Sequence, residues 1–173
     1  MYQNSYKHGE HVKQLSDTIQ LAMNMNNLRK TRYDSENFQV MNYGTGGSIS
    51  MHLDSQGQDA TPGEDINTGG LRFVTFMIYL SPVTAGGHTI FPQAGIWQKP
   101  EVGDALYWFN VDSGGFVDTR NHHMGCPTLV GNKWIANKWI HWHAQMWSYP
   151  CHAKKGHPFR PFSNNHVQSR HDI

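Results

Sequence analysis

The stretch FQVMNYGTGGSISMHLD, residues 38–54, shows the pattern that decides the fold. Two runs with aromatic, β-branched or alternating side chains flank a glycine-rich turn, which is typical of two short strands. Similar runs, bounded by Gly, Pro, Asn and Asp, recur downstream. Strands are predicted at 37–43, 48–54, 71–80, 88–91, 104–110, 116–120, 127–130 and 133–142. So many short strands favour a mainly β fold, a sandwich or barrel of the jelly-roll type.

The residues before this stretch have a helical pattern instead. Val12, Leu15, Ile19 and Met23 recur at helical spacing, with polar residues between them. This spacing predicts one amphipathic helix over about 10–26. The expected architecture is therefore a jelly roll with an N-terminal amphipathic helix.

The length of the chain, 173 residues, suits one domain. We assign residues 1–151 to that domain and the polar residues 152–173 to a poorly ordered C-terminal tail. Residues 55–70, SQGQDATPGEDINTGG, are rich in turn formers and lack apolar periodicity. They are expected to form a long loop, of the kind that often serves as a lid.

The charge balance gives no sign of a highly charged partner. With 14 basic and 13 acidic residues the formal charge is +1, so no strongly basic surface for nucleic acid is expected. No apolar run approaches the roughly 20 residues that a membrane-spanning helix needs. The first residues, MYQNSYKHGE, also lack the apolar core of a secretory signal. We expect a neutral or weakly charged partner, and neither nucleic acid nor a membrane.

A candidate metal site begins with His52 and Asp54. In a strand, side chains two residues apart point to the same face, so this imidazole and this carboxylate are expected to lie side by side. Together with a distant histidine they would form the facial triad of non-haem iron oxygenases. An H-x-D pair is common by chance, so a third ligand is needed to support this interpretation.

Residues 119–142, TRNHHMGCPTLVGNKWIANKWIHW, contain candidates for the rest of the site. His122 and His123 are both possible third ligands. Lys133 follows ten residues after His123 and is a candidate cation for the far carboxylate of 2-oxoglutarate, whose keto acid end chelates iron. The alternative for Lys133 is a solvated surface lysine beside a Gly131-Asn132 turn.

The cysteine content limits the other kinds of site. Cys126 and Cys151 are the two cysteines, too few for a cysteine-rich zinc site or a dense disulfide framework. From the residues alone, one bridge and two unrelated thiols are both possible.

Four blocks of the chain resemble the prolyl 4-hydroxylase family, and in particular the catalytic domain of animal collagen prolyl 4-hydroxylase alpha subunits. The blocks are NYGTGGSISMHLD, RFVTFMIYLSPVTAGGHTIFPQAG, GDALYWFN and TR…HMGCPTLVGNKWIANKWIHW. Their order and spacing agree over residues 38–151, about two-thirds of the chain.

The resemblance implies a double-stranded β-helix and a set of site residues. Iron would be bound by His52, Asp54 and His123, because the family's HxxCP spacing selects His123 and makes His122 a neighbour. Lys133 would bind the distal carboxylate of 2-oxoglutarate.

Three further residues enter by the same resemblance. Tyr43 and Thr75 would be supporting contacts to the co-substrate, and Trp139 would be a wall of the pocket. Such residues on strands are also common as ordinary core residues.

The implied activity is an Fe(II)- and 2-oxoglutarate-dependent dioxygenase, which uses O2 and L-ascorbate and hydroxylates proline at C4 in collagen-like or proline-rich peptides. Neutral proline-rich segments dock on aromatic grooves, for which the candidate side chains are those of Tyr79, Trp97, Tyr107 and Trp108. The alternatives are a catalytically silent peptide-binding paralogue and a dioxygenase that acts on another substrate.

The resemblance also implies a cellular setting. It suggests the endoplasmic reticulum lumen and protein disulfide isomerase as a partner, and in that compartment a Cys126–Cys151 disulfide would be favoured. A complete family member also has a secretory signal, a dimerisation region and a peptide-binding region. We therefore expect a fragment, a truncated isoform or a degenerate paralogue, with an early strand missing and unpaired backbone groups at a sheet edge.

The register near His123 poses a local problem. If Gly131-Asn132 were a two-residue hairpin turn, an unbroken ladder would place His123 and Lys133 on opposite faces. Because a shared site requires them on one pocket, a bulge or break is predicted around 125–127.

Overall fold

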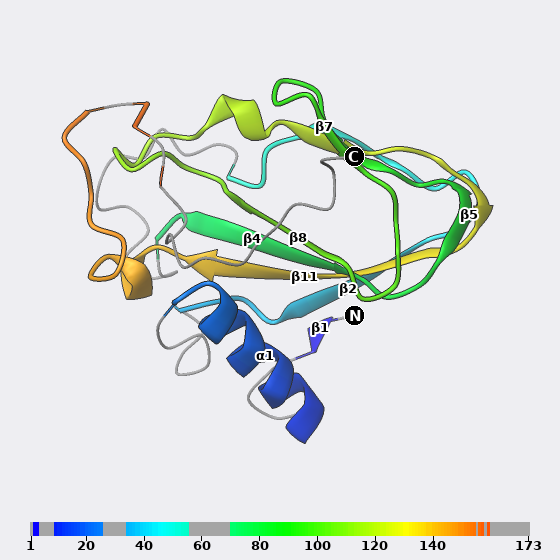
Figure 1. Ribbon diagram of the computed structural model, residues 1–173, viewed down its shortest axis with the longest axis horizontal. Helices are drawn as coiled ribbons and strands as arrows, with labels where there is room; N and C mark the ends of the chain where they lie inside the picture. The colour runs from blue at the N-terminus through cyan, green and yellow to red at the C-terminus, as the bar shows by residue number, and fades with distance from the viewer. Residues whose placement is uncertain are drawn as a thin grey trace, which may run out of the picture.

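The structure is a computed structural model that describes residues 2–3, 9–25, 34–55, 70–154, 156, 157 and 159 (Figure 1). Two short 3-10 helices lie in the second half of the chain, at Thr119–Asn121 and His143–Gln145. The other elements, in chain order, are β1 (Tyr2–Gln3), α1 (Glu10–Ala22), β2 (Phe38–Tyr43), β3 (Ile49–His52), β4 (Arg72–Tyr79), β5 (Val83–Gly86), β6 (Thr89–Phe91), β7 (Ile96–Gln98), β8 (Ala105–Phe109), β9 (His123–Gly125), β10 (Thr128–Gly131) and β11 (Lys133–His141).

The strands form antiparallel sheets between which the chain alternates. The larger sheet has the order β1-β2-β11-β4-β8, and a smaller one has the order β3-β9-β6-β7, with β10 and β5 as a separate pair. From β2 onward, each excursion into the smaller sheet or the pair is followed by a return to the larger sheet. This alternation is that of a jelly roll, so the predicted fold class is confirmed. In the described part of the chain β2 has neighbours on both sides, although β1 covers it over two residues only.

Helix α1 covers the face of the larger sheet that points away from the smaller one (Figure 1). It ends at Ala22, four residues before the predicted end, because Asn24 adopts a left-handed φ of 47°. The N–H of Met25 then donates to the carbonyl of Gln20 at 2.9 Å, as in a Schellman cap. Among the described residues, no helix is long and apolar enough to cross a membrane.

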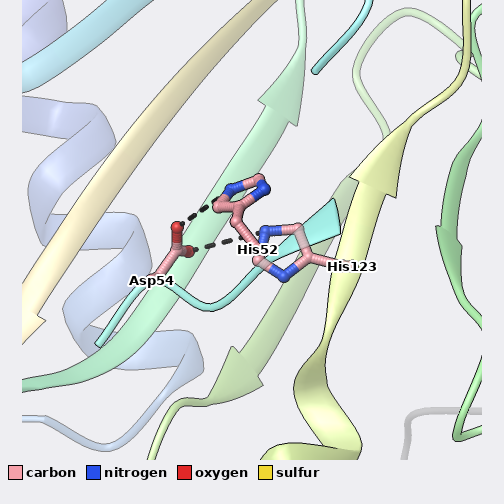
Figure 2. Close-up of side chains that lie close together, drawn as sticks. All are labelled: His52, Asp54 and His123. Carbon is pink, nitrogen blue, oxygen red and sulfur yellow. Dashed lines mark ion pairs between the residues drawn. The ribbon is translucent and has the colours of Figure 1, made fainter. Parts of the chain in front are cut away.

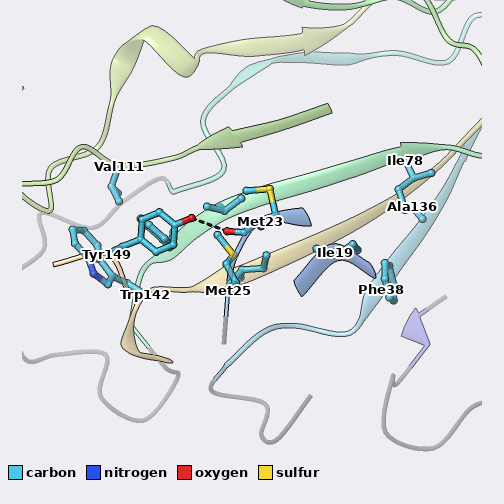
Figure 3. Packing of buried hydrophobic residues seen from close by; sticks show 12 residues of the cluster. Ile19, Met23, Met25, Phe38, Ile78, Val111, Ala136, Trp142 and Tyr149 are labelled. Atoms are coloured by element: carbon cyan, nitrogen blue, oxygen red, sulfur yellow. Dashed lines mark hydrogen bonds between the residues drawn. The ribbon is translucent and has the colours of Figure 1, made fainter. Parts of the chain in front are cut away.

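Two apolar clusters lie on the two faces of the larger sheet. Between α1 and the sheet, Ile19 packs with Phe38, Ile78 and Ala136, and the Tyr149 hydroxyl donates to the carbonyl of Met23 at 2.7 Å (Figure 3). Between the two sheets, the cluster comprises Met77, Tyr79, Phe91, Trp108 and Ile135. The larger sheet is thus packed on both faces, and its inner face borders the space between the sheets.

The predicted strand at 116–120 was wrong. The Asp112 carboxylate accepts hydrogen bonds from the N–H groups of Gly114 and Phe116, which closes a tight loop. One isolated bridge, Val111 to Val117, and a 3-10 helix at Thr119–Asn121 follow in place of the strand. Strands β5, β7 and β9, three or four residues each, were not predicted, because runs this short carry little periodicity.

The predicted break between His123 and Lys133 is confirmed. Strand β9 pairs with β3 and β6, whereas β10 pairs with β5, so the ladder does not continue through residues 126–127. The chain changes partners there, and β11 belongs to the larger sheet rather than to a hairpin with β10. This change of sheet allows His123 and Lys133 to reach the same side.

The disulfide expected between the two cysteines is absent, because both Cys126 and Cys151 are free. The two residues are held by different parts of the fold. The N–H of Cys126 donates to the carbonyl of His88, while the next residue after Cys151, His152, donates to the carbonyl of Ser113. The backbone next to each cysteine is therefore held by a different part of the fold.

The expected lid and tail are described only in part. Of the loop 55–70, the structure describes Ser55 and Gly70, so the lid prediction lies outside the described residues. Part of the expected tail packs on the domain. The N–H of Ser113 donates to the carbonyl of His157 at 2.9 Å, and the ring of Phe159 lies 4.9 Å from that of Phe73. These described residues beyond 151 are thus in contact with the core.

Gly86, at the end of β5, is a position where alanine should be strongly destabilising. Its φ is +76°, and an added Cβ would lie 2.3 Å from the carbonyl oxygen of Pro127. Gly86→Ala is expected to lower the free energy of unfolding by on the order of 3 kcal/mol in chemical denaturation. Gly46 is the matched control: its φ is +81° but an added Cβ meets nothing within 4 Å, so Gly46→Ala should cost about 1 kcal/mol. Equal losses would show that the close approach to β10 is unimportant.

Candidate metal centre

Three side chains, from two neighbouring strands and the bend that follows one of them, converge on one place (Figure 2). His52 is the last residue of β3, Asp54 lies in the bend that follows it, and His123 begins β9, opposite His52 in the register. The Asp54 carboxylate oxygens lie 3.5 Å from Nε2 of His52 and 3.8 Å from Nε2 of His123. The predicted triad therefore comes together, and the predicted common orientation of His52 and Asp54 is observed.

Backbone carbonyls set the orientation of both imidazoles. Nδ1 of His52 lies 2.8 Å from the carbonyl oxygen of Ser50, and Nδ1 of His123 lies 2.9 Å from that of Asn121. A carbonyl can only accept, so each Nδ1 carries a proton, and Nε2 is the nitrogen of each ring that faces Asp54. His122 is turned away, with its Nδ1 2.9 Å from the carbonyl of Thr119.

The donor set fits a divalent transition metal. Two neutral imidazole nitrogens and one carboxylate form the facial set of non-haem Fe(II) sites, which leaves other coordination positions open. Within the described residues, no other group of three such side chains is close enough to bind one ion.

The environment keeps the Asp54 carboxyl ionised. Burial alone would raise its pKa, but hydrogen bonding with His52, the charge of His123 and the Thr75 hydroxyl together hold the pKa below its usual value. The hydrogen bond with Asp54 raises the pKa of His52, whereas burial lowers the pKa of His123. A lowered pKa of both Asp54 and His123 favours metal binding, because the ligands must lose their protons when an ion binds.

A cavity of about 260 Å³ connects this triad to Lys133. The Lys133 side chain is 2% exposed, and its Nζ donates to the Thr89 hydroxyl at 3.2 Å. In the described part of the chain no carboxylate lies within ion-pair distance of it, and burial lowers its pKa to about 8. Lys133 is thus a buried cation with no counter-charge among the described residues, and the alternative of a solvated surface lysine is wrong.

The other three predicted site residues are placed differently from one another. Tyr43 and Trp139 both line the cavity, and the Tyr43 ring centre is 5.7 Å from Nζ of Lys133. Thr75 instead donates its hydroxyl to Oδ2 of Asp54 at 2.6 Å. Thr75 therefore contacts a candidate metal ligand, Asp54, and it is not among the residues that line the cavity.

Several polar residues of the cavity were not predicted from the sequence. Arg72 lies 3.8 Å above the Trp139 ring, and its guanidinium is gripped by Glu36 at 2.5 and 2.9 Å. Among the described residues, neither Asn137 Oδ1 nor the indole nitrogen of Trp108 has a hydrogen-bond partner, although both atoms are buried. Alternation along β11 from Lys133 would have placed Asn137 on the inner face, but nothing in its sequence context distinguishes it from a core residue.

The aromatic residues suggested for peptide docking separate into two groups. Tyr79 and Trp108 are buried in the cluster between the sheets, with the Trp108 ring 4.7 Å from that of His123. Trp97 and Tyr107 are exposed by 62% and 41%. Only the exposed pair remains available for a docking surface.

The sequence matches known proteins over this same region. Human prolyl 4-hydroxylase subunit alpha-1 is 41% identical over 118 residues, which cover 68% of this chain and 22% of the human protein. Human prolyl 4-hydroxylase subunit alpha-3 is 44% identical over 117 residues, 68% of this chain and 21% of that protein. This chain therefore spans about a fifth of the length of these curated relatives.

Solved structures agree with the architecture. A viral collagen prolyl hydroxylase from Paramecium bursaria Chlorella virus-1, solved as a 2OG complex, superposes with a TM-score of 0.56 at 26% identity. That alignment covers 76% of this chain and 68% of the viral one. A prolyl hydroxylase from Trichoplax adhaerens, in complex with a hypoxia-inducible factor peptide, shares the fold with a TM-score of 0.53 at 22% identity, over 82% of this chain and 61% of that one.

A family model covers both halves of the candidate site. The model of the 2OG-Fe(II) oxygenase superfamily matches residues 38–141, a range that contains the triad, Lys133 and the cavity between them. The resemblance to prolyl 4-hydroxylase alpha subunits is confirmed by the relatives above. The chain belongs to the 2OG-Fe(II) oxygenase superfamily.

Proposed function

We propose that this chain is an Fe(II)- and 2-oxoglutarate-dependent dioxygenase domain that hydroxylates proline at C4 in collagen-like or proline-rich peptides. The observation that carries the proposal is the buried ammonium of Lys133, which shares one cavity with a His-Asp-His triad. A site of this kind suits a ligand with a carboxylate at one end and a metal-chelating group at the other.

Each residue has a role in this proposal. His52, Asp54 and His123 hold Fe(II), which when bound with 2-oxoglutarate supplies the oxidising chemistry with O2. Lys133 binds the distal carboxylate of 2-oxoglutarate. Tyr43 borders the same end of the cavity as Lys133 and supports the co-substrate, and Trp139 forms a wall of the pocket.

The peptide substrate is proposed from two kinds of support. Relatives at 41% and 44% identity are named prolyl 4-hydroxylase subunits. The exposed aromatic side chain of Trp97 offers a flat surface on which proline rings pack well, whereas Tyr107 pairs with Phe76 on the opposite face of the larger sheet.

The cellular setting is proposed by extension from the same relatives. We propose the endoplasmic reticulum lumen as the compartment, L-ascorbate as the reductant that maintains Fe(II), and protein disulfide isomerase as a partner subunit. Co-expression of this chain with protein disulfide isomerase, followed by gel filtration, would test the partnership.

The activity is tested with purified protein, Fe(II), ascorbate, 2-oxoglutarate and a (Pro-Pro-Gly)-repeat peptide. Succinate should form in step with a mass gain of one oxygen atom per hydroxylated proline. Succinate with an unmodified peptide would favour a dioxygenase for another substrate. Neither product from an iron-loaded protein would favour a catalytically silent peptide-binding paralogue.

The requirement for 2-oxoglutarate should depend on pH through Lys133. Burial lowers the pKa of this lysine to about 8, so its ammonium form is lost as the pH rises through 8. An anionic ligand binds the ammonium form and raises its pKa. The KM for 2-oxoglutarate should therefore be flat below about pH 8 and rise by up to about tenfold per pH unit above it.

The control for this pH effect is a keto acid without a second carboxylate. Pyruvate is measured as a competitor of 2-oxoglutarate. Because it has no distal carboxylate for Lys133 to bind, its affinity should not fall as Lys133 loses its proton above pH 8. If both acids weaken in parallel, the titration belongs to the metal centre and Lys133 is not the binding cation.

A further inference from the structure

We propose that Asn110 is a positioning residue that acts through Thr75 to fix the orientation of the Asp54 carboxylate. The inference rests on the proposed metal centre, and it concerns which carboxylate oxygen is presented to the ion. Asn110 lies just after β8, outside the residues that line the cavity.

A chain of two hydrogen bonds links the three side chains. Nδ2 of Asn110 donates to Oγ1 of Thr75 at 2.9 Å, and Oγ1 of Thr75 donates to Oδ2 of Asp54 at 2.6 Å. The direction follows from the chemistry, because an ionised carboxylate only accepts and the hydroxyl has one proton to give. The hydroxyl lone pairs then accept from the amide, which makes the hydroxyl a better donor.

The chain is enclosed by protein. Thr75 is 0% exposed and Asn110 is 2% exposed. In the register of the larger sheet, Thr75 lies between Trp108 on β8 and Trp139 on β11, so two indoles flank it. The hydrogen bonds are therefore shielded from competing water, and the loss of one partner leaves a buried polar group unsatisfied.

The backbone holds Asn110 in place independently of its side chain. Its N–H donates to the carbonyl of Phe73 at 2.8 Å, and its carbonyl accepts from the N–H of Asp118 at 3.0 Å. A change of the side chain alone leaves both bonds intact. Asn110 is thus a fixed point from which the amide reaches Thr75.

Asp54 needs such a support because it lies beyond the end of β3. Its own strand does not constrain the last torsion of the side chain, which is broad for aspartate. With Oδ2 held by Thr75, Oδ1 is left free of that bond and lies 3.5 Å from Nε2 of His52. Oδ2 also lies 3.8 Å from Nε2 of His123, but one of its lone pairs is already used by Thr75, so Oδ1 is the oxygen with more capacity left to bind an ion.

The test is Co(II) binding to the metal-free protein, followed by the visible absorption of the bound ion. Thr75→Val removes the hydroxyl and keeps the shape, and it should weaken Co(II) binding by about 10- to 100-fold. Asn110→Ala should weaken binding by about tenfold and alter the absorption spectrum. Thr75→Ser restores the hydroxyl and should bind within about threefold of the wild-type protein.

The decisive variant combines Asn110→Ala with Thr75→Val. If Asn110 acts through the Thr75 hydroxyl, the double variant should bind Co(II) as Thr75→Val does, with no further loss. Additive losses, or an unchanged affinity in Asn110→Ala, would overturn the inference. Val74→Ala is the control for general destabilisation: Val74 is buried on the opposite face of β4, so its loss should lower the melting temperature and leave Co(II) affinity unchanged.

The outcome also separates this inference from the proposed function. Wild-type protein that binds Co(II), with loss of binding in His52→Ala, supports the metal centre whatever Asn110 does. A wild-type protein that does not bind Co(II) at all would overturn both. Circular dichroism melting of every variant identifies any that fails to fold, and Thr75→Ser then carries the comparison.

Discussion

His52→Ala is expected to abolish succinate formation from 2-oxoglutarate, with a loss of more than about a hundredfold. The imidazole is one of the three proposed ligands, and its Nε2 faces Asp54 at 3.5 Å. The two groups that remain, Asp54 and His123, would bind a metal weakly and without the geometry of the site. Succinate is measured by mass spectrometry, and retained iron is measured on the same sample.

His122→Ala is the matched control for that experiment. His122 is the sequence neighbour of His123, but its Nδ1 points to the carbonyl of Thr119, away from the triad. This variant should retain iron and turnover close to those of the wild-type protein. Loss of activity in His122→Ala, or its retention in His52→Ala, would contradict the assignment of the ligands.

Lys133→Met should raise the KM for 2-oxoglutarate by at least about a hundredfold. The variant leaves the distal carboxylate of the co-substrate buried without a cation, and breaking a buried charge pair costs roughly 3–5 kcal/mol. The kcat at saturating 2-oxoglutarate should fall much less, because Lys133 does not belong to the triad. The effect therefore separates binding of the co-substrate from metal chemistry.

The same variant should stabilise the ligand-free protein. A shift of the Lys133 pKa from 10.5 to about 8 corresponds to a free-energy cost of about 3 kcal/mol for burying the ammonium form. Methionine fills the space without that cost, so the melting temperature should rise, and 2-oxoglutarate should no longer raise it further. A lower melting temperature in Lys133→Met would argue that Lys133 has a structural partner.

Lys138→Met is the control for Lys133→Met. Lys138 is on the same strand, is fully buried, and has a pKa that burial likewise lowers to about 8. Its Nζ lies near the Phe38 ring on the helix side of the sheet and donates to the carbonyl of Glu36. This variant should leave the KM for 2-oxoglutarate unchanged. A similar rise in KM for both variants would show that the effect comes from the loss of a buried lysine on β11 in general, and not from the loss of a cation in the cavity.

These contrasts depend on the opposite faces of one strand. Lys133, Asn137 and Trp139 line the cavity, whereas Ala136 and Ile140 pack in the cluster beneath α1. Strand β11 is central in the larger sheet, paired with β2 and β4, so neither face can shift in register without losing both ladders. The long central strand therefore holds Lys133, the proposed cation for 2-oxoglutarate, at a fixed distance from the triad.

The amino-acid sequence by itself determined the longer strands, the helix and the pairing of His52 with Asp54. These features are local, because alternation along a strand and spacing along a helix follow from the geometry of a few neighbouring residues. The choice of His123 over His122 came from the resemblance to prolyl 4-hydroxylases. The break at 126–127 could be predicted because two residues of one site had to reach the same face.

Only the tertiary structure decided the burial of Lys133, the support of Asp54 and the state of the cysteines. Asn110, Thr75 and Asp54 are far apart in the chain and meet because β8, β4 and the end of β3 come together. Nothing local marks such contacts, since they depend on which strands pair and how they are layered. Desolvation has the same origin: a lysine next to a predicted turn becomes a buried cation only when two sheets close over it.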